Sequence, residues 1–391
     1  MEYQILQIGE ICTRFSSGKN ITASDIHEEG DFPVYGGNGL RGYTSRSNFK
    51  GECVLIGRQG AYCGNVRYFS GEGYMSEHAI VGVTNEMHDT KYFAYKLSLL
   101  GLGRLSGQAA QPGLSVTKLS KMKLEMPPLP TQRKIASILS AYDNLIENNR
   151  RRIKLLEQMA QNLYKEWFVR FRFPGYQNAE FENGTPKGWE EIPLDNLLIN
   201  GFNGGWGEDS ETEKCSFMGY VIRGTDIEDV RMANYDKVPL RFHKKSDIEN
   251  KHLLANDIIL ELSNGNLDNI GRTLFVTENI LNRFNNVMSA SFCKTLRFAC
   301  STDAYMVYRH ITYLQKSGLL NFYKNTGTNG INNFNYKRFL KHKFIIPNDK
   351  KLVEQLMKID MLTSNLADSS HLLTAQRDLL LPRLMSGKLS V

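Results

Sequence analysis

One uninterrupted segment constrains this chain more than any other, because residues 131–173 contain neither glycine nor proline. Four residues rich in proline, 127–130, precede it, Thr131 can serve as the N-cap, and Pro174 ends it. Apolar residues recur within it at alternating intervals of four and three, which is the heptad pattern of a coiled coil. At ~1.5 Å per residue the helix is roughly 60 Å long, so its apolar seam needs a partner helix.

A second apolar seam lies 217 residues further along the chain and predicts that partner helix. It starts behind Pro347 and an Asn348-Asp349 cap, and the same shift carries Asp143 onto Asp360. Asn149, the polar member of the first seam, either favours one register at some cost in stability or occupies a partly exposed position. The predicted seam consists of Ile135, Leu139, Tyr142, Ile146, Asn149, Ile153, Leu156 and Leu163, followed by Leu352, Leu356, Ile359, Leu366, Leu373 and Leu380.

The recurrence extends to the segments before each helix, which indicates an internal duplication. Residues 8–11 match 194–197 at an offset of 186, and residues 53–55 with Arg67 match 258–260 with Arg272 at an offset of 205. Strand-like runs at 53–56, 79–83, 257–262 and 273–276, with short helices at 90–100 and 304–315, give the globular parts an α+β character. We predict two loop-rich globular domains, 1–130 and 175–346, joined by two long helices, 131–174 and 347–391.

The composition is that of a soluble globular protein of two or three domains. Of the 391 residues 41% are hydrophobic and 23% are charged, which argues against a disordered chain. The sequence shows neither a signal-like start nor an apolar stretch of ~20 residues, and its six cysteines include no Cys-x-x-Cys pair that would suit structural zinc. We expect a cytoplasmic protein with free thiols, no metal and no membrane association.

Motifs for catalysis are missing from the sequence. Residues 37–42 fit G-x-G-x-x-G, but neither an amphipathic helix nor an acidic residue about 20 positions later follows, so a glycine turn between strands is the better interpretation. The sequence has no G-x-x-x-x-G-K-[ST] loop, no G-x-S-x-G elbow and no amino-methyltransferase motif, and its eight histidines are scattered. We therefore predict a chain that is not an enzyme by itself and has no catalytic residues.

Two clusters of basic and amide side chains suit nucleic acid. Residues 33–71 hold five basic side chains against the single acid Glu52. Arg can bind guanine, and Asn or Gln adenine, through two hydrogen bonds, while Lys, Ser and Tyr suit phosphates. A solvated loop is the alternative interpretation for any single residue. The predicted DNA-binding residues are Arg41, Tyr43, Arg46, Arg58, Gln59, Tyr62, Asn65 and Arg67 in the first domain, and Arg223, Thr225, Arg241, Lys244, Lys245, Asn264, Asn266 and Arg272 in the second.

The formal charge of +7 lies mainly on the first long helix, where residues 131–172 include nine basic and four acidic side chains. The two globular domains are nearly neutral, so the total charge is a poor argument for DNA binding. The duplication, the paired helices and the Arg-, Asn- and Gln-rich loops are the better argument.

The sequence resembles the specificity subunits of type I restriction-modification enzymes. The resemblance is carried by PPLPTQRKIASIL at 127–139 and LIENNRRRIKLLEQMAQNLYKEWF at 145–168, by the preceding GQAAQPGLSVTKLSKMKLEMPPLP, and by YGGNGLRGY at 35–43 and VLIGRQGAYCGNV at 54–66. Residues 111–168 are its most specific part. In the second half Pro347-Asn348-Asp349 replaces the Pro-Leu-Pro-Thr form, so the last helix is assigned from periodicity and order.

The resemblance implies a non-catalytic DNA sequence-specificity subunit whose domains each read one half of a bipartite site on double-stranded DNA. It implies that the long helices form an antiparallel coiled coil with an internal pseudo-twofold axis, set the spacer between half-sites and dock the partners. Those partners are two methyltransferase subunits and, in the complete enzyme, two ATP-dependent restriction/translocase subunits. S-adenosylmethionine, ATP and magnesium would belong to the partners and not to this chain.

Two other hypotheses remain open from the residues alone. A self-contained nuclease or methyltransferase would need a carboxylate cluster or a cofactor motif. A coiled-coil nucleic-acid-binding scaffold unrelated to restriction would bind RNA, or a membrane, through Arg150-Arg151-Arg152 and Lys154. A solvated helix face presents the same kind of basic run.

Overall fold

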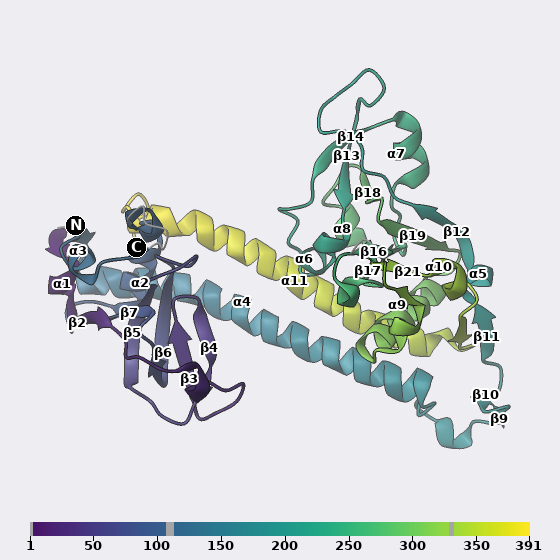
Figure 1. Ribbon diagram of the computed structural model, residues 1–391, viewed down its shortest axis with the longest axis horizontal. Helices are drawn as coiled ribbons and strands as arrows, with labels where there is room; N and C mark the ends of the chain where they lie inside the picture. The colour runs from purple at the N-terminus through teal and green to yellow at the C-terminus, as the bar shows by residue number, and fades with distance from the viewer. Residues whose placement is uncertain (1–2, 107–112, 328–331) are drawn as a thin grey trace. The chain divides into compact units, whose positions relative to one another are not determined.

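The computed structural model describes residues 3–106, 113–327 and 332–391, and Figure 1 shows the course of the chain through them. The chain divides into two compact units. Unit 1 comprises Met1–Leu145 and Leu373–Val391, and unit 2 comprises Ile146–Leu372. Each unit therefore contains one globular part and a stretch of both long helices. Gln111 and the GQAA sequence before it, which contribute to the family resemblance, lie outside the described residues.

Unit 1 is built on a six-stranded sheet with the order β2-β7-β5-β6-β3-β4, and β1 pairs separately with β8. Residues 53–56 of the central strand are buried on both faces, and α2 covers one face with Phe93 and Leu97. The strands are β1 (Gln4–Gln7), β2 (Cys12–Ser17), β3 (Phe32–Gly36), β4 (Gly39–Thr44), β5 (Phe49–Gly57), β6 (Val66–Met75), β7 (Ala79–Thr84) and β8 (Lys123–Met126). The short helices are α1 (Ile8–Ile11), η1 (Ala23–Asp25), α2 (Thr90–Ser98), η2 (Leu102–Leu105) and α3 (Val116–Ser120).

Unit 2 has more and shorter strands, in sheets ordered β12-β19-β15-β17, β14-β13-β18 and β16-β21-β20 and in the pairs β11-β22 and β10-β9. The strands are β9 (Phe181–Glu182), β10 (Thr185–Pro186), β11 (Glu190–Pro193), β12 (Leu198–Asn203), β13 (Phe217–Ile222), β14 (Leu240–His243), β15 (Ile258–Glu261), β16 (Ser263–Asn264), β17 (Thr273–Phe275), β18 (Val287–Ser289), β19 (Cys293–Phe298), β20 (Lys324–Asn325), β21 (Asn332–Phe334) and β22 (Lys343–Ile346). The short helices are η4 (Tyr176–Asn178), α5 (Leu194–Leu197), η5 (Gly224–Asp226), α6 (Ile227–Arg231), α7 (Lys245–Lys251), η6 (Leu267–Asn269), α8 (Glu278–Leu281), α9 (Ser301–Lys316), η7 (Leu319–Tyr323) and α10 (Tyr336–Phe339).

The two units repeat one topology, which confirms the predicted duplication. The order β2-β7-β5-β6 in unit 1 corresponds to β12-β19-β15-β17 in unit 2. The segment β1–α1–β2 recurs as β11–α5–β12 at a constant offset of 186. Strands β2 and β12 each carry a bulge at the equivalent point, after Cys12 in β2 and after Leu198 in β12. The repeat is therefore preserved down to a local irregularity of the ladder.

The offset of 205 predicted for the middle of the repeat is wrong by one residue. Gly57 and Glu261 end equivalent strands, because their N–H groups donate to the carbonyls of Asn65 and Arg272 at 2.8 and 2.9 Å. The offset at this point is therefore 204, and Arg67 does not occupy the same place as Arg272. Apolar strand residues resemble one another, so a one-residue slip is invisible in the sequence and is decided only by the pairing register.

The long helices are α4 (Leu129–Tyr164) and α11 (Lys350–Met385), each of 36 residues. The expectation that Thr131 is an N-cap is wrong, because Pro128 already accepts the first helical hydrogen bonds and Pro130 is tolerated in the first turn. The regular helix also ends before residue 173: a π-helical turn, η3 (Lys165–Val169), follows it. The predicted cap of α11 is present, since the Asp349 carboxylate accepts from the Lys351 N–H at 3.0 Å.

The predicted seam positions of both helices are buried or half-buried. In unit 1, Ile135 and Leu139 at the start of α4 share a core with Leu384 near the end of α11. In unit 2, Ile153 of α4 packs with Ala367 of α11. The start of one helix is thus matched with the end of the other, which is the antiparallel arrangement that the family resemblance implies.

A tyrosine–aspartate pair attaches each globular part to a long helix. In unit 1 the Tyr95 hydroxyl of α2 donates to Asp143 of α4, and Arg377 of α11 pairs with the same carboxylate at 2.6 Å. In unit 2 the Tyr305 hydroxyl of α9 donates to Asp360 of α11 at 2.9 Å. The two aspartates are the pair that the 217-residue shift predicts, so the shift holds for the helices although α4 and α11 begin 221 residues apart.

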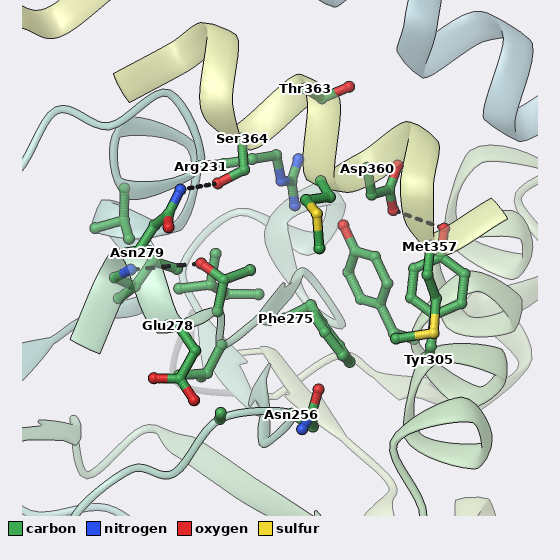
Figure 2. Close-up of a pocket in the computed structure, with 18 of the residues that line it drawn as sticks. Arg231, Asn256, Phe275, Glu278, Asn279, Tyr305, Met357, Asp360, Thr363 and Ser364 are labelled. Atoms are coloured by element: carbon green, nitrogen blue, oxygen red, sulfur yellow. Dashed lines mark hydrogen bonds between the residues drawn. The ribbon is translucent and has the colours of Figure 1, made fainter. Parts of the chain in front are cut away.

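A cavity of about 390 Å³ lies in unit 2 beside the second of these attachments. Figure 2 shows Tyr305 beside Asp360, and Asn279 of α8 hydrogen-bonded to Ser364 of α11; the ring centroid of Phe275 lies 5.7 Å from that of Tyr305. Its charged lining is balanced, with three basic and three acidic side chains. Polar contacts around the cavity therefore add to the apolar packing of Met357 and Ala367 that joins α11 to its globular domain.

Candidate nucleic-acid interface

Two loops of unit 1 meet at one end of its sheet. They are the turn between β3 and β4, at residues 37–38, and the connection between β5 and β6, at residues 58–65. Their backbones touch, because a side chain on Gly37 would lie 3.3 Å from the Cα atom of Gly57. Arg67 Nη2 also donates to the carbonyl oxygen of Asn38 at 3.2 Å. The two loops therefore form one continuous surface, and the G-x-G-x-x-G match is the expected glycine turn.

Backbone hydrogen bonds hold the longer of these loops on the rest of unit 1. The Arg58 N–H donates to His78 and its carbonyl accepts from the Leu114 N–H, both at 2.9 Å. The turn beside it needs glycine, because Gly39 has a φ of 98°. Side chains thus project from a fixed backbone, which is how a recognition loop on a rigid scaffold is built.

This loop surface contains Arg41, Arg58, Gln59, Tyr62, Asn65 and Arg67, of which Arg58 is half-buried and the others are exposed. Tyr43 and Arg46 lie elsewhere, toward the other end of β4. Tyr43 exchanges backbone hydrogen bonds with His27, and Arg46 pairs with Asp25 at 2.9 Å. The structure thus gathers most of the predicted residues of the first domain at one place and separates these two from them.

The corresponding loops of unit 2, residues 223–239 and 262–272, meet at Gly224 and Glu261. The side chain of Arg272 bridges them: its Nε donates to the Glu261 carboxylate and its Nη2 to the Gly224 carbonyl, both at 2.9 Å. Glu261 is 2% exposed, and its other carboxylate oxygen accepts from Asn264 at 2.7 Å. A buried ion pair therefore lies at the base of the two loops.

Three arginines that we predicted as DNA contacts form ion pairs within unit 2. Arg272 is one of them. Arg223 makes two hydrogen bonds with Asp226, at 2.8 and 2.7 Å, and a third with the Lys237 carbonyl. Arg241 is 8% exposed, lies 4.4 Å from the Trp206 ring centroid and pairs with Asp209. Asp226 lies only three residues after Arg223, whereas Asp209 and Glu261 lie too far from Arg241 and Arg272 in the sequence to be assigned before the fold was known.

The remaining predicted residues of unit 2 form two groups. Thr225 and Asn266 are exposed on the two loops, and Asn264 is half-buried between them. Lys244 and Lys245 are exposed at the opposite end of β13, where His243 pairs with Phe217. Residues suited to bases and residues suited to phosphates therefore occupy different parts of the surface.

Sequence reasoning missed the role of Glu261. The available signal was an acidic residue at the end of an otherwise apolar strand, Ile-Ile-Leu-Glu, directly before an Asn-rich loop. A carboxylate buried at such a place needs a basic partner. Only the fold shows that the partner is Arg272.

Within residues 3–106, 113–327 and 332–391, no group of three or more His, Cys, Asp or Glu side chains is arranged to hold a metal ion. Across the same ranges, no helix is both long and apolar enough to cross a membrane. Burial raises the pKa of the Cys12 and Cys53 thiols to about 12, so neither is a thiolate at neutral pH.

Comparison with known families decides what kind of domain carries these loops. Residues 1–158 match the family model described as the type I restriction modification DNA specificity domain. The first loop surface thus lies within the matched residues, and the match includes the first 30 residues of α4.

Curated relatives carry the same name. Over 142 residues the chain is 39% identical to the type I restriction enzyme EcoprrI specificity subunit of Escherichia coli, which is 35% of each protein. It is 33% identical over 115 residues to the MjaIX specificity subunit of Methanocaldococcus jannaschii, or 27% of this chain and 26% of that one. A putative specificity subunit of Mycoplasma pneumoniae is 28% identical over 46% of this chain and 61% of its own length. Each alignment spans less than two thirds of the relative.

A solved structure extends the likeness of the fold to the second unit. The crystal structure of the type I restriction-modification S subunit from M. genitalium superposes with a TM-score of 0.66 over 98% of this chain and 96% of that one. Sequence identity is 16%, so this likeness concerns the fold alone. The whole chain has the fold of a specificity subunit: mixed α and β domains joined by two long helices.

Proposed function

We propose that this chain is the non-catalytic DNA sequence-specificity subunit of a type I restriction-modification system, in which each unit reads one half of a bipartite site. The observation that carries the proposal is the loop surface of unit 1, where Arg58, Gln59 and Asn65 project from a fixed backbone inside a matched specificity domain. Unit 2 has the same strand order and places a second pair of loops at the corresponding edge. Two readers on one chain bind a duplex with a high effective concentration, so each can be weak while the pair is selective.

The long helices are proposed to set the spacer between the half-sites and to dock two methyltransferase subunits, with two restriction/translocase subunits in the complete enzyme. Apolar side chains that the seam leaves exposed on the two helices support docking. In unit 1 they are Ile138, Leu145 and Leu379, and in unit 2 they are Leu155, Met159, Met361, Leu362 and Leu372.

The cofactors follow from this division of labour. We propose that S-adenosylmethionine, ATP and magnesium are bound by the partner subunits, since the role proposed for this chain is recognition. The protein would then act in the cytoplasm, where bacterial and archaeal DNA lies. Phosphate contacts made by the partners would add the salt-dependent part of the affinity, because the recognition units are nearly neutral.

Exchange of one recognition domain tests the proposal. The chain is co-expressed with the methyltransferase gene of its own operon, and N6-methyladenine is mapped across the host genome. The expected result is a bipartite methylated motif. Replacing residues 1–126 with the equivalent segment of a homologue should change one half of that motif and leave the other half intact. A change in both halves would exclude two independent readers, and the absence of any motif would exclude the function itself.

A further inference from the structure

The pair of loops that forms each proposed reading surface is tied together by one arginine. In unit 2, Arg272 reaches from the start of β17 to the carbonyl of Gly224, directly after β13. In unit 1, Arg67 reaches from the start of β6 to the carbonyl of Asn38, in the turn after β3. The two arginines are not matching positions of the repeat, yet each spans the same pair of loops.

The geometry around Arg272 leaves little freedom for another arrangement. The side chain is 15% exposed, its Nε and Nη2 donors are both engaged, and the carboxylate of Glu261 is 3% exposed. Gly224 packs directly on that carboxylate, since a Cβ atom there would lie 2.0 Å from Glu261 Oε1. A planar guanidinium with two parallel donors can bridge a carboxylate and a carbonyl, whereas a lysine ammonium is a single point charge.

In unit 1 the two loops also approach each other closely, but without a buried ion pair. Gly57 stands where unit 2 has Glu261, and its backbone contacts Gly37, the counterpart of Gly224. Arg67 therefore has no buried carboxylate beneath it, and its side chain is exposed. The link at 3.2 Å is a single hydrogen bond to a carbonyl. We call the two arginine links, Arg272 and Arg67, clamps. They differ in strength although they join equivalent loops.

We propose that Arg272 and Arg67 are positioning residues, each of which fixes the distance between the two DNA-reading loops of its unit. This inference rests on the proposed function, because it concerns how the loops read DNA. Arg272 acts on base recognition through Thr225 and Asn266, the exposed side chains on the loops that it joins. Arg67 acts in the same way on Gln59 and Asn65. Loss of a clamp widens the set of sequences accepted by one half-site, because the two loops no longer keep one spacing.

The test compares Arg272→Lys and Arg67→Lys with Arg170→Lys, an exposed arginine of unit 2 that pairs with Glu166 in the turn after α4. Amide hydrogen exchange is measured on the DNA-free full chain. For Arg272→Lys we expect exchange about tenfold faster in residues 224–231 and 263–271, the factor that corresponds to losing one charge-assisted hydrogen bond. Exchange in strands β15 and β19 should be unchanged, and exchange in the Arg170→Lys protein should match that of the wild type. Arg67→Lys should accelerate exchange in residues 37–39 and 58–65 by a smaller factor.

The second measurement is the methylated motif of each variant in cells that also make the methyltransferase. Several positions of one half-site should become degenerate, a different half for each arginine. Unchanged loop exchange together with loss of a single base position would identify a base contact and overturn the proposal. Faster exchange throughout β15 and β19 would overturn it as well, because the residue would then support the fold in general. If Arg272→Lys does not fold, Arg67→Lys decides, since it leaves no buried carboxylate unpaired. Failure of the wild-type chain to direct a bipartite motif would reject the proposed function and leave the exchange result standing.

Discussion

The hydroxyl group of Tyr305 donates a hydrogen bond of 2.9 Å to the carboxylate of Asp360, which joins helix α9 of a globular domain to the long helix α11. Arg309, which is 7% exposed, donates to the same carboxylate and to the Tyr305 oxygen. Burial raises the pKa of Asp360, and the neighbouring Arg309 opposes that rise. A desolvated cation and its counter-ion are therefore shared between the two elements.

Asp360→Asn should lower the unfolding free energy of unit 2 by about 3 kcal/mol, because it leaves the Arg309 guanidinium buried without a counter-ion. Urea unfolding followed by tryptophan fluorescence reports on this unit selectively, since Trp167, Trp189 and Trp206 all belong to it. Asp143→Asn is the matched control in unit 1 and should leave that transition unchanged. An equal shift from both substitutions would contradict the local role of the pair.

Acid should destabilise unit 2 through a chain of buried hydrogen bonds that links Tyr164, His310, His342 and Tyr323 at 2.7 to 2.9 Å. Desolvation, with the facing His342, lowers the pKa of His310 to about 3, and burial also lowers the pKa of His342. Folded pKa values below the unfolded value of about 6.5 mean that the unfolded chain takes up protons first as the pH falls. The contribution of the two histidines to the unfolding free energy of unit 2 is therefore fully present above pH ~6.5. Below that pH it declines, by up to about 1.4 kcal/mol per pH unit for each histidine.

The pH profile of urea unfolding between pH 7 and 4, again by tryptophan fluorescence, measures this decline. His310→Gln should flatten it, whereas replacement of the exposed His27 in unit 1 should have no effect on it. Identical slopes for wild type and His310→Gln would show that the histidine pair does not contribute.

Asn149→Leu should raise the unfolding free energy of unit 2 by about 1 kcal/mol, because a polar side chain in an apolar seam is retained at a cost in stability. Asn149 is 7% exposed, so the alternative that it occupies an exposed part of the seam is wrong. Asn148, its neighbour, is exposed and provides the control: Asn148→Leu should change stability by less than about 0.5 kcal/mol. A loss of stability in Asn149→Leu would indicate that the amide is held by hydrogen bonds worth more than the apolar gain.

Arg58→Ala should weaken binding to the methylated motif by about 1 to 3 kcal/mol and leave non-specific binding nearly unchanged, as expected for a base contact. Lys244→Ala, at the exposed end of β14, should weaken binding to all sequences alike and reduce the slope of log affinity against log salt by about 1. Fluorescence anisotropy of the assembled methyltransferase with motif and scrambled duplexes, at several salt concentrations, separates the two. A uniform loss for Arg58→Ala would make it a phosphate contact.

The sequence predicted those parts of the fold that depend on periodicity. The two long helices, the strands at 53–56 and 79–83 and the helices at 90–100 and 304–315 are confirmed, because each depends on a local pattern of apolar residues. Helix ends were less predictable, since the Pro128 carbonyl and the turn after Tyr164 are set by backbone geometry.

The candidate site was predictable only in part. Gln59 and Asn65 stand on a Gly-rich loop that follows the recognisable strand at 53–56, so their exposure follows from local pattern. Arg223, Arg241 and Arg272 were expected to face DNA because their type and spacing suit bases, but Asp226, Asp209 and Glu261 engage them. The pairs of Arg241 and Arg272 join separate segments and depend on tertiary structure, which a single sequence does not display, whereas Asp226 lies three residues after Arg223.

The bulges after Cys12 and Leu198 have a consequence for anyone who builds hybrid chains. A bulge restores the alternation of side chains after one extra residue, so the rest of β2 and β12 presents its apolar set to the core. Deleting a single residue at either bulge would move the core-facing side chains of the following strand to the solvent-facing side of the sheet. Segments should therefore be exchanged beyond these two points, in the loops, where a change of length leaves the inward and outward faces of the sheet as they are.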